Sequence, residues 1–210
     1  MSDARRLRRL AVLGVAVSAG CAVALTGCAA AKRAPVAAPQ IPTIVASTAV
    51  TTTVAPADRP LPDDCKLVVP AVDVDGVVGQ PLDGQPARIL GVPEPTVGRT
   101  GKLDCYYGIP EGRTIASAAI VIGLATYADE ASAQQRVRDS VDSERQDGAG
   151  VADIAVEKMQ GKLVTGKTER MVIGSLGRTT YVVRAKNGVF PDDKVGAALA
   201  ALAVKALTPK

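Results

Sequence analysis

The sequence predicts an α+β fold: an antiparallel sheet with helices packed on one face, after a cleaved signal and a disordered tether. Two observations carry this prediction. Residues 63–210 alternate between segments with a helical period and segments with a strand period, in the order helix, strands, helix, strands, helix. Residues 1–62 instead contain a basic and apolar leader, followed by a Pro-rich stretch without a period. We therefore expect three parts: a leader at 1–27, a tether at 28–62, and a single domain at 63–210.

The first part is typical of an export signal. Four arginines within residues 5–9 precede 16 uncharged residues at 10–25, a run shorter than the about 20 residues of a membrane-spanning helix. The run ends in Leu-Thr-Gly-Cys at 25–28, which resembles the lipobox of bacterial lipoproteins. The resemblance implies cleavage before Cys28 and lipidation of its thiol. An ordinary signal peptide or an uncleaved anchor is the alternative. No twin-arginine consensus surrounds the Arg pairs, so the general secretion route is expected, with the twin-arginine route as the alternative.

The exported part is close to neutral. The whole chain has a net charge of +4, and residues 1–27 hold four Arg and one Asp, or +3, which leaves +1. Such a charge provides no steering field for nucleic acids or other polyanions. The chain also contains no Trp, one Phe and four Tyr. This scarcity argues against a sugar-stacking cleft and against binding of single-stranded nucleic acid.

The tether is recognised by composition. Residues 28–62 contain six prolines among many Ala, Thr and Val, and they show no apolar face. A mixed coil of this length reaches about 30–60 Å from a membrane. The Thr cluster at 48–53 is compatible with O-glycosylation, although a plain spacer is the simpler interpretation.

The helices and strands of the domain are predicted from the period of the apolar residues and from the residues typical of helix ends and turns. The expected helices are 70–78, 129–145 and 192–207. The expected strands are 103–107, one within 115–126, and a meander over 162–186 with turns at 166–167, 175–177 and 187–188. The first helix has Pro70 in its first turn and Gly79 at its end. Asp129 is the expected N-cap of the second helix, and Asp192 or Asp193 that of the third.

The run at 115–126 has an unusual alternation. Large side chains at Ile120, Ile122 and Leu124 alternate with smaller ones, so the strand should have one large face and one small face. The small residues are Ala119, Gly123 and Ala125. They leave room between sheet and helix for a lipid-like ligand, or for close helix packing.

Cys65 and Cys105 are the two cysteines of the domain. Thiols oxidise outside the cytoplasmic membrane and the count is even, so we expect a disulfide between them. A metal site is not expected, because the chain has no His and two thiolates rarely suffice. The pair is not C-x-x-C, which argues against a redox role.

Short motifs carry a resemblance to known proteins. Residues 65–79 read Cys-x-Leu-x-x-Pro-Ala-x-x-Val-x-x-x-x-Gly, residues 103–106 read Leu-Asp-Cys-Tyr, and a later helix begins Asp-Glu-Ala-Ser. With the lipobox and tether, the chain resembles small envelope lipoproteins of mycobacteria and other actinobacteria whose domains have no assigned function. It is also loosely similar to extracellular sensor domains of actinobacterial Ser/Thr kinases, which have more disulfides. The resemblance implies no catalytic residues.

The stretch GKLVTGKT at 161–168 fits the phosphate-binding loop pattern G-x-x-x-x-G-K-[ST]. Such a loop needs a helix starting at its Lys-Thr, so that N–H groups face the phosphates. Residues 169–184 instead have strand and turn composition. We therefore expect a hairpin turn at Gly166-Lys167 and no nucleotide.

Other catalytic signals are weak. The absence of His removes Ser-His and Cys-His machinery. A calcium-loop start at 73–76 has Val77 and Gly84 where oxygen ligands are required. Carboxylate pairs occur at 63–64, 129–130 and 192–193, two of them at expected helix starts, where capping is the simpler role. Of the adjacent Tyr106 and Tyr107, one should be buried and the other exposed.

These observations predict a membrane-anchored extracytoplasmic lipoprotein with a non-catalytic, sensor-like domain that binds a ligand or a partner. It is expected on the outer face of the cell membrane, held by the lipid on Cys28. The expected partners are a lipid-like ligand or an envelope protein. No cofactor, metal, nucleotide or nucleic acid is expected. A carboxylate-based hydrolase of an envelope substrate and a purely structural envelope protein remain the alternatives.

Overall fold

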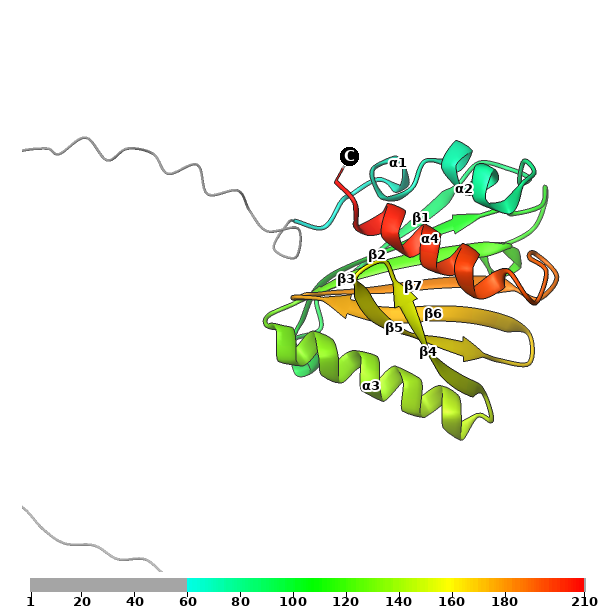
Figure 1. Cartoon of the computed structure of the whole chain (residues 1–210). Helices are drawn as coiled ribbons and strands as arrows, with labels where there is room; N and C mark the ends of the chain where they lie inside the picture. Colours follow the sequence, from blue (N-terminus) through cyan, green and yellow to red (C-terminus); the bar gives the residue numbers. More distant parts are fainter. Residues whose placement is uncertain (1–59, 210) are drawn as a thin grey trace, which may run out of the picture. The chain divides into compact units, whose positions relative to one another are not determined.

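The structure is a computed structural model that describes residues 60–209. Seven strands form one antiparallel sheet in the order β1-β2-β3-β7-β6-β5-β4 (Figure 1). The strands are β1 Ala87–Gly91, β2 Arg99–Tyr107, β3 Ile120–Tyr127, β4 Gly150–Val156, β5 Met159–Thr165, β6 Glu169–Leu176 and β7 Thr179–Lys186. The helices are α1 Cys65–Val68, α2 Ala71–Val78, α3 Glu130–Gln146 and α4 Val195–Leu207, with short 3₁₀ turns η2 Pro95–Val97 and η3 Ile115–Ser117. The predicted α+β class is confirmed.

The two faces of the sheet follow from the register of its central strand, β3. Ile122 pairs with Cys105 on one side and Val183 on the other, and these three side chains belong to one buried core. Gly123 pairs with Asp104 and Val182, whose side chains therefore point to the opposite face. The predicted division of this strand into a large face and a small face is confirmed.

Helices cover both of these faces (Figure 1). Helices α1, α2 and α4 share the main core with the large face of β3, whereas α3 does not, so the prediction that the helices pack on one face is wrong for α3. Helix α3 lies on the small face, where Val141 packs against Met171 and Ile173 of β6. Helix α3 is polar except for one thin apolar stripe. A stripe this narrow can bury only a few side chains, which matches the small number of buried residues in this second core. The sheet is therefore the middle of three layers.

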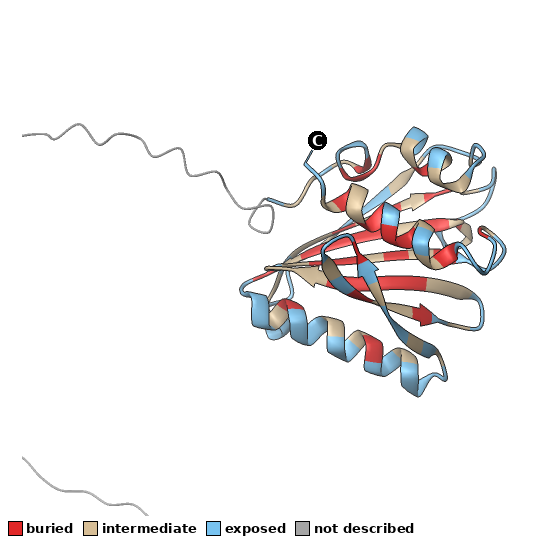
Figure 2. Ribbon diagram, in the orientation of Figure 1, coloured by how far each residue is buried: buried red, intermediate tan, exposed pale blue. Residues whose placement is uncertain are grey.

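Helix α4 supplies one wall of the main core. Its predicted stripe of Val195, Leu199, Leu202 and Ala206 is buried, and Figure 2 shows buried residues along the central strands and one side of this helix. The predicted N-cap at Asp192 or Asp193 is wrong. The helix begins after Lys194, and the Pro191 carbonyl oxygen accepts the N–H groups of Lys194 and Val195 at 3.0 Å each. A backbone carbonyl thus closes the turn that a carboxylate was expected to close.

The start of α3 is as predicted. The Asp129 carboxylate accepts a hydrogen bond from the Ser132 N–H at 2.7 Å, and this bond lowers the pKa of Asp129. Helix α2 also ends as expected, with Gly79 in the left-handed conformation at φ 86°. Both helix ends could be predicted from the sequence, because each depends on the type of a single residue at that end.

The stretch GKLVTGKT forms a β-hairpin rather than a loop before a helix. Gly161 lies within β5, the Gly166 N–H donates to the Glu169 carbonyl oxygen at 3.0 Å, and β6 follows at once. A Cβ atom on Gly161 would lie 3.0 Å from the Tyr181 hydroxyl oxygen, and one on Gly174 would lie 2.3 Å from it. The first glycine of the pattern therefore makes room for a buried tyrosine, and the predicted turn is confirmed.

Two buried tyrosines differ in what their hydroxyl groups contact. The Tyr107 hydroxyl donates to the Val69 carbonyl oxygen at 2.7 Å, whereas that of Tyr181 has no hydrogen-bond partner among residues 60–209. Burial raises the pKa of both phenols, that of Tyr181 to about 12. The hydrogen bond of Tyr107 therefore connects β2 to the segment after α1. The Tyr181 hydroxyl is buried without a hydrogen bond to offset the loss of its contacts with water.

This difference predicts opposite effects of removing the two hydroxyl groups. Tyr107→Phe should lower the free energy of unfolding by about 1–2 kcal/mol, because the buried Val69 carbonyl loses its donor. Tyr181→Phe should leave it unchanged or raise it by about 1 kcal/mol, because no bond is lost. Urea unfolding followed by circular dichroism measures both. A larger loss in Tyr181→Phe than in Tyr107→Phe would contradict the assignment.

Candidate functional site

A cleft of about 270 Å³ lies between α3 and the sheet. Its floor comes from β2, β3, β6 and β7, and its overhanging wall comes from α3. Helix α3 packs mainly on β6, β7 and β3, so the β2 side of this face is left uncovered. The cleft is therefore a consequence of a narrow helix lying off the centre of a wide sheet.

The middle of the floor is made of small residues. Gly123 and Ala125 of β3 line the cleft with the buried Thr180 of β7. A Cβ atom on Gly123 would lie 2.6 Å from the Asp104 Oδ1 atom, so the glycine lets this carboxylate lie across the floor. Two of the three small residues singled out from the sequence thus line a cavity. The third does not: Ala119 packs at the start of β3, where a Cβ on Gly108 would come within 2.8 Å of its Cβ.

Charged side chains line the cleft, and most have partners. Lys102 forms an ion pair with Asp104 at 2.7 Å, and Arg99 forms one with Glu94 at 2.8 Å. The Arg184 guanidinium is farther from its carboxylate, at 3.6 Å from Glu169. The cations of the cleft are therefore neutralised to different degrees, and Arg184 is held least tightly of these three.

Two guanidinium groups carry a buried donor that lacks an acceptor. The Nε–H groups of Arg99 and Arg184 have no hydrogen-bond partner among residues 60–209. A buried unpaired donor costs about 1–3 kcal/mol of stability, so such groups are uncommon unless they have another use. Both arginines line the cleft.

Tyr106 lies on the cleft face of β2, paired with Val121 in the register of the sheet. Partial burial raises the pKa of its phenol, Asp104 raises it further, and Arg184 lowers it. The phenol therefore stays protonated at neutral pH. Its neighbour Tyr107 is only 2% exposed, in the opposite core, so the predicted split between a buried and a more exposed tyrosine is confirmed.

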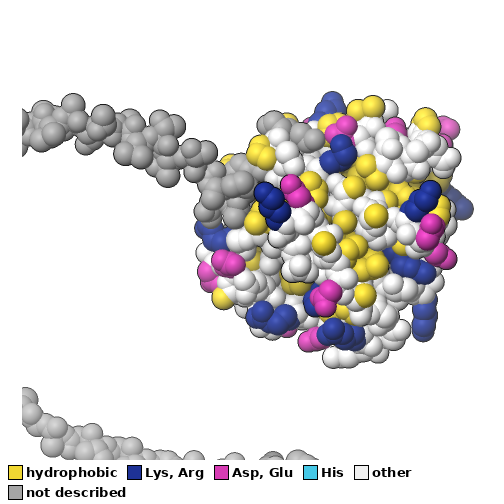
Figure 3. Space-filling view, in the orientation of Figure 1, with side chains coloured by type: hydrophobic (Ala, Val, Ile, Leu, Met, Phe, Trp, Pro, Cys, Tyr) yellow, Lys and Arg dark blue, Asp and Glu magenta, His cyan; other side chains and the backbone are white. Residues whose placement is uncertain are grey.

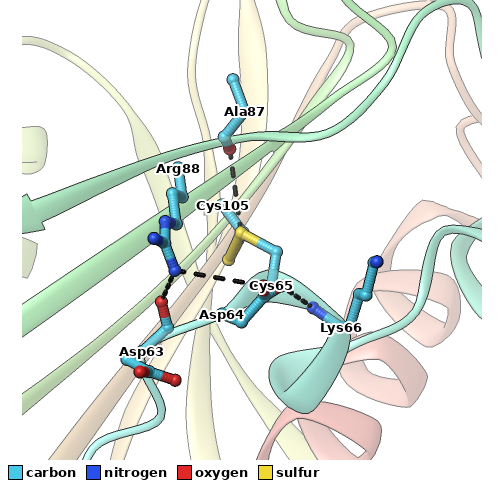
Figure 4. Close-up of polar contacts among 7 residues, drawn as sticks. All are labelled: Asp63, Asp64, Cys65, Lys66, Ala87, Arg88 and Cys105. Atoms are coloured by element: carbon cyan, nitrogen blue, oxygen red, sulfur yellow. Dashed lines mark hydrogen bonds and ion pairs between the residues drawn. A yellow bond between two sulfur atoms is a disulfide. The ribbon is translucent and has the colours of Figure 1, made fainter.

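A disulfide supports the strand next to the cleft. Cys65 of α1 is bonded to Cys105 of β2, the pairing expected from the sequence (Figure 4). The Cys105 side chain points away from the cleft, since it pairs with Ile122 on the large face. Asp64 caps α1 by accepting the Lys66 N–H at 2.9 Å. The bridge thus fastens the start of the domain to the back of the cleft floor.

Other residues considered from the sequence have local roles. Asp75 lies in α2 and accepts the Leu82 N–H at 3.0 Å, so its segment is a helix and not a calcium loop. Asp192 is exposed and lies 3.8 Å from Arg170. Within residues 60–209, no three His, Cys, Asp or Glu side chains gather in a way that could hold a metal ion. The expected lipidation site, Cys28, lies outside the described residues.

The carboxylates that do line the cleft are Asp104, Asp139 and Glu144, none of which was singled out from the sequence. A signal for one of them exists. In β2, Lys102, Asp104 and Tyr106 alternate with Leu103, Cys105 and Tyr107, which is the pattern of a strand with one polar face. No pattern in α3 distinguishes its cleft-facing side chains from its other polar residues.

In the described part of the chain, residues 60–209, no helix is both long and apolar enough to span a membrane. No protein-family model matches the chain. No curated protein matches it. Among solved structures, the crystal structure of the extracellular domain of PknH from Mycobacterium tuberculosis is similar, with a TM-score of 0.44 and 12% identity, over 71% of this chain and 97% of that one. Similarity at this level is too weak to assign a function, and the resemblance to envelope lipoproteins stays a prediction.

Proposed function

We propose that this chain is a lipid-anchored extracytoplasmic protein whose domain binds a small ligand in the cleft between α3 and the sheet, without catalysing a reaction. One observation carries the proposal: the cleft has a floor of small residues flanked by apolar side chains and by donors without acceptors. Ligand sites in proteins typically combine an apolar lining with a few convergent polar groups. The anchor rests on the Leu-Thr-Gly-Cys motif at 25–28.

The polar groups of the cleft favour binding over catalysis. Its hydroxyl side chains are those of Tyr127, Ser140, Ser143 and Thr180, and none is hydrogen-bonded to a base among the described residues. An activated nucleophile needs such a base. The Asp104 carboxylate is held in an ion pair by Lys102 at 2.7 Å.

The surface is consistent with local capture at a membrane. Figure 3 shows Lys and Arg interspersed with Asp and Glu on the face where α4 lies. Mixed charges do not attract polyanions over a distance. A tether of about 30–60 Å would hold the domain close to the membrane, where a ligand enters by diffusion over a short range.

Filling the cleft tests the proposal. In Gly123→Leu the new side chain occupies the floor, and the flexible Asp104 side chain moves aside, at a cost of about 1–3 kcal/mol in stability. Native mass spectrometry of the chain exported by its own host should show a bound small molecule in the wild type and none in Gly123→Leu.

Gly150→Leu is the matched control. Gly150 begins β4, outside the cleft, and the nearest atom to an added Cβ is the Thr165 Cβ at 3.7 Å. This variant should retain the molecule. A bound molecule that survives in a folded Gly123→Leu protein, with the circular dichroism of the wild type, would place binding elsewhere and contradict the proposal.

A further inference from the structure

We propose that the cleft binds an organic anion with an apolar body, a carboxylate or phosphate monoester whose charged oxygens contact Arg184. This inference rests on the proposed function and specifies its ligand class. Three observations support it: the position of Arg184, the presence of a second cation on α3, and the apolar lining around both.

Arg184 is placed to receive an anion. It lies on β7 between Val121 of β3 and Met171 of β6, on the face covered by α3. Its side chain is 42% exposed, its Nε–H is buried without an acceptor, and its carboxylate partner is 3.6 Å away. A guanidinium has five donors, and a carboxylate or phosphate can accept two of them in parallel. Most of this hydrogen-bonding capacity is unused by the described residues.

A second cation overhangs the same cleft. Arg136 projects from α3 and lines the cavity, and no hydrogen bond or ion pair joins it to another described residue. One turn further along α3, the hydroxyl group of Ser140 lines the cleft as a neutral donor. Lys102 contributes less, because Asp104 already neutralises it at 2.7 Å. Arg136 stands one turn after Ser132, which lies beside Gly98 at the Arg99 end of β3, so Arg136 adds positive charge to the cleft without lying over Arg184.

Arg99 is the competing position, and two facts disfavour it. Arg99 pairs with Tyr127 and Arg184 with Val121, so the two arginines lie near opposite ends of β3, about 20 Å apart. The charged group of one small ligand in a cleft of about 270 Å³ therefore cannot contact both guanidinium groups. The Arg99 guanidinium is bound closely to Glu94 at 2.8 Å, with a further contact to the Val92 carbonyl oxygen at 3.4 Å. The less engaged Arg184 is the stronger anion site.

The rest of the lining suits an apolar body. Val121, Val137, Ile173 and Val182 surround the floor next to Arg184, beside the Asp104 carboxylate that lies across Gly123. A volume of about 270 Å³ lies just below the about 300–1,000 Å³ of typical small-molecule sites. The cleft therefore holds a small amphipathic anion, or the charged end and first segment of a longer one. Fatty acids and lipid phosphates share this chemistry.

Titration calorimetry with three probes of equal chain length tests the ligand class: dodecanoate and dodecyl phosphate below their micellar concentrations, and dodecanol below its solubility limit. The protein is the mature chain 28–210 carrying Cys28→Ser, exported on an ordinary secretory signal and therefore free of lipid. At least one anion should bind, and dodecanol should bind at least about 10-fold more weakly, since a charged hydrogen-bonded group contributes about 1.5–3 kcal/mol. Whichever anion binds more tightly identifies the headgroup.

Arg184→Gln should weaken binding of the anion by about 10-fold or more and leave that of dodecanol unchanged. The matched control is Lys186→Gln, two residues along the same strand and on the same face, but outside the cleft. Arg136→Gln, compared with Arg138→Gln on the solvent side of α3, tests the second cation in the same way.

Equal affinities for dodecanol and both anions, or an Arg184→Gln protein that binds the anions as tightly as the wild type, would overturn the anion assignment. The proposed function would still stand if Gly123→Leu abolished binding of dodecanol. Failure of all three probes to bind the folded wild type would also overturn the ligand class, and the bound molecule retained by host-exported protein would then decide the proposed function separately.

Discussion

Replacing Cys65 and Cys105 together by Ala should lower the free energy of unfolding by about 4 kcal/mol. The bridge closes a loop of 40 residues in sequence separation, and the chain-entropy estimate for such a loop gives this magnitude. The local structure points the same way. Helix α1 has four residues, too few to be stable alone, and the bridge fastens it to β2 near the end of that strand. Urea unfolding followed by circular dichroism measures the loss.

The wild type unfolded in the presence of a reducing agent should match the double variant, which separates loss of the bridge from loss of the sulfur atoms. Both cysteines are buried, at 5% and 0% exposure, so a residual difference between the two samples reports packing alone. Equal stability of the oxidised wild type and the double variant would contradict a structural role for the bridge.

Cys28→Ser should abolish lipid labelling of the chain completely. Serine has no thiol to receive a diacylglycerol, and a chain without acyl groups loses about 0.8 kcal/mol of membrane affinity per buried CH₂. Labelling cells with an alkyne fatty acid, followed by capture of the exported protein, measures the effect. Cys21→Ser is the matched control: Cys21 lies in the same apolar run but has Ser18 where the lipobox Leu would stand, so labelling should persist. Undiminished labelling in Cys28→Ser would show that the motif is not used.

Elements defined by local residue types were predictable from the sequence. Asp129 and Gly79 set helix ends that the structure confirms, and the stripe of α4 was readable because apolar residues recur at a helical period. The hairpin in GKLVTGKT was readable because strand composition follows it.

The strands at the two edges of the sheet were missed. Strand β1 has exposed Ile89 and Leu90 and is bounded by Pro86 and Pro93, so it lacks the alternation of a half-buried strand. Strand β4 is likewise mostly exposed, and only Val156 at its end is buried. Edge strands contact few neighbouring residues, so their sequences show little of the apolar alternation that identifies a strand.

The cleft was only half predictable. The small residues Gly123 and Ala125 indicated space beside one strand, and this was correct. Arg184 could not be connected to them, because its place beside Val121 depends on the pairing of β3 with β7 across more than 50 intervening residues. Long-range register of this kind is set by the packing of the whole sheet. The sequence also could not show which face of the sheet α3 covers, because the apolar stripe of this helix could pack on either face.

The central claim is that the ligand occupies the cleft between α3 and the sheet, and methyl NMR of the mature chain tests it most directly. The two faces of the sheet provide an internal control, because Val121, Ile173 and Val182 line the cleft while Ile122 and Val183 lie in the opposite core. On titration with the tighter-binding dodecyl anion, we expect saturable shifts of the first three residues' methyl signals and little change in the other two. Shifts confined to the opposite core, or none at saturating probe, would contradict the account.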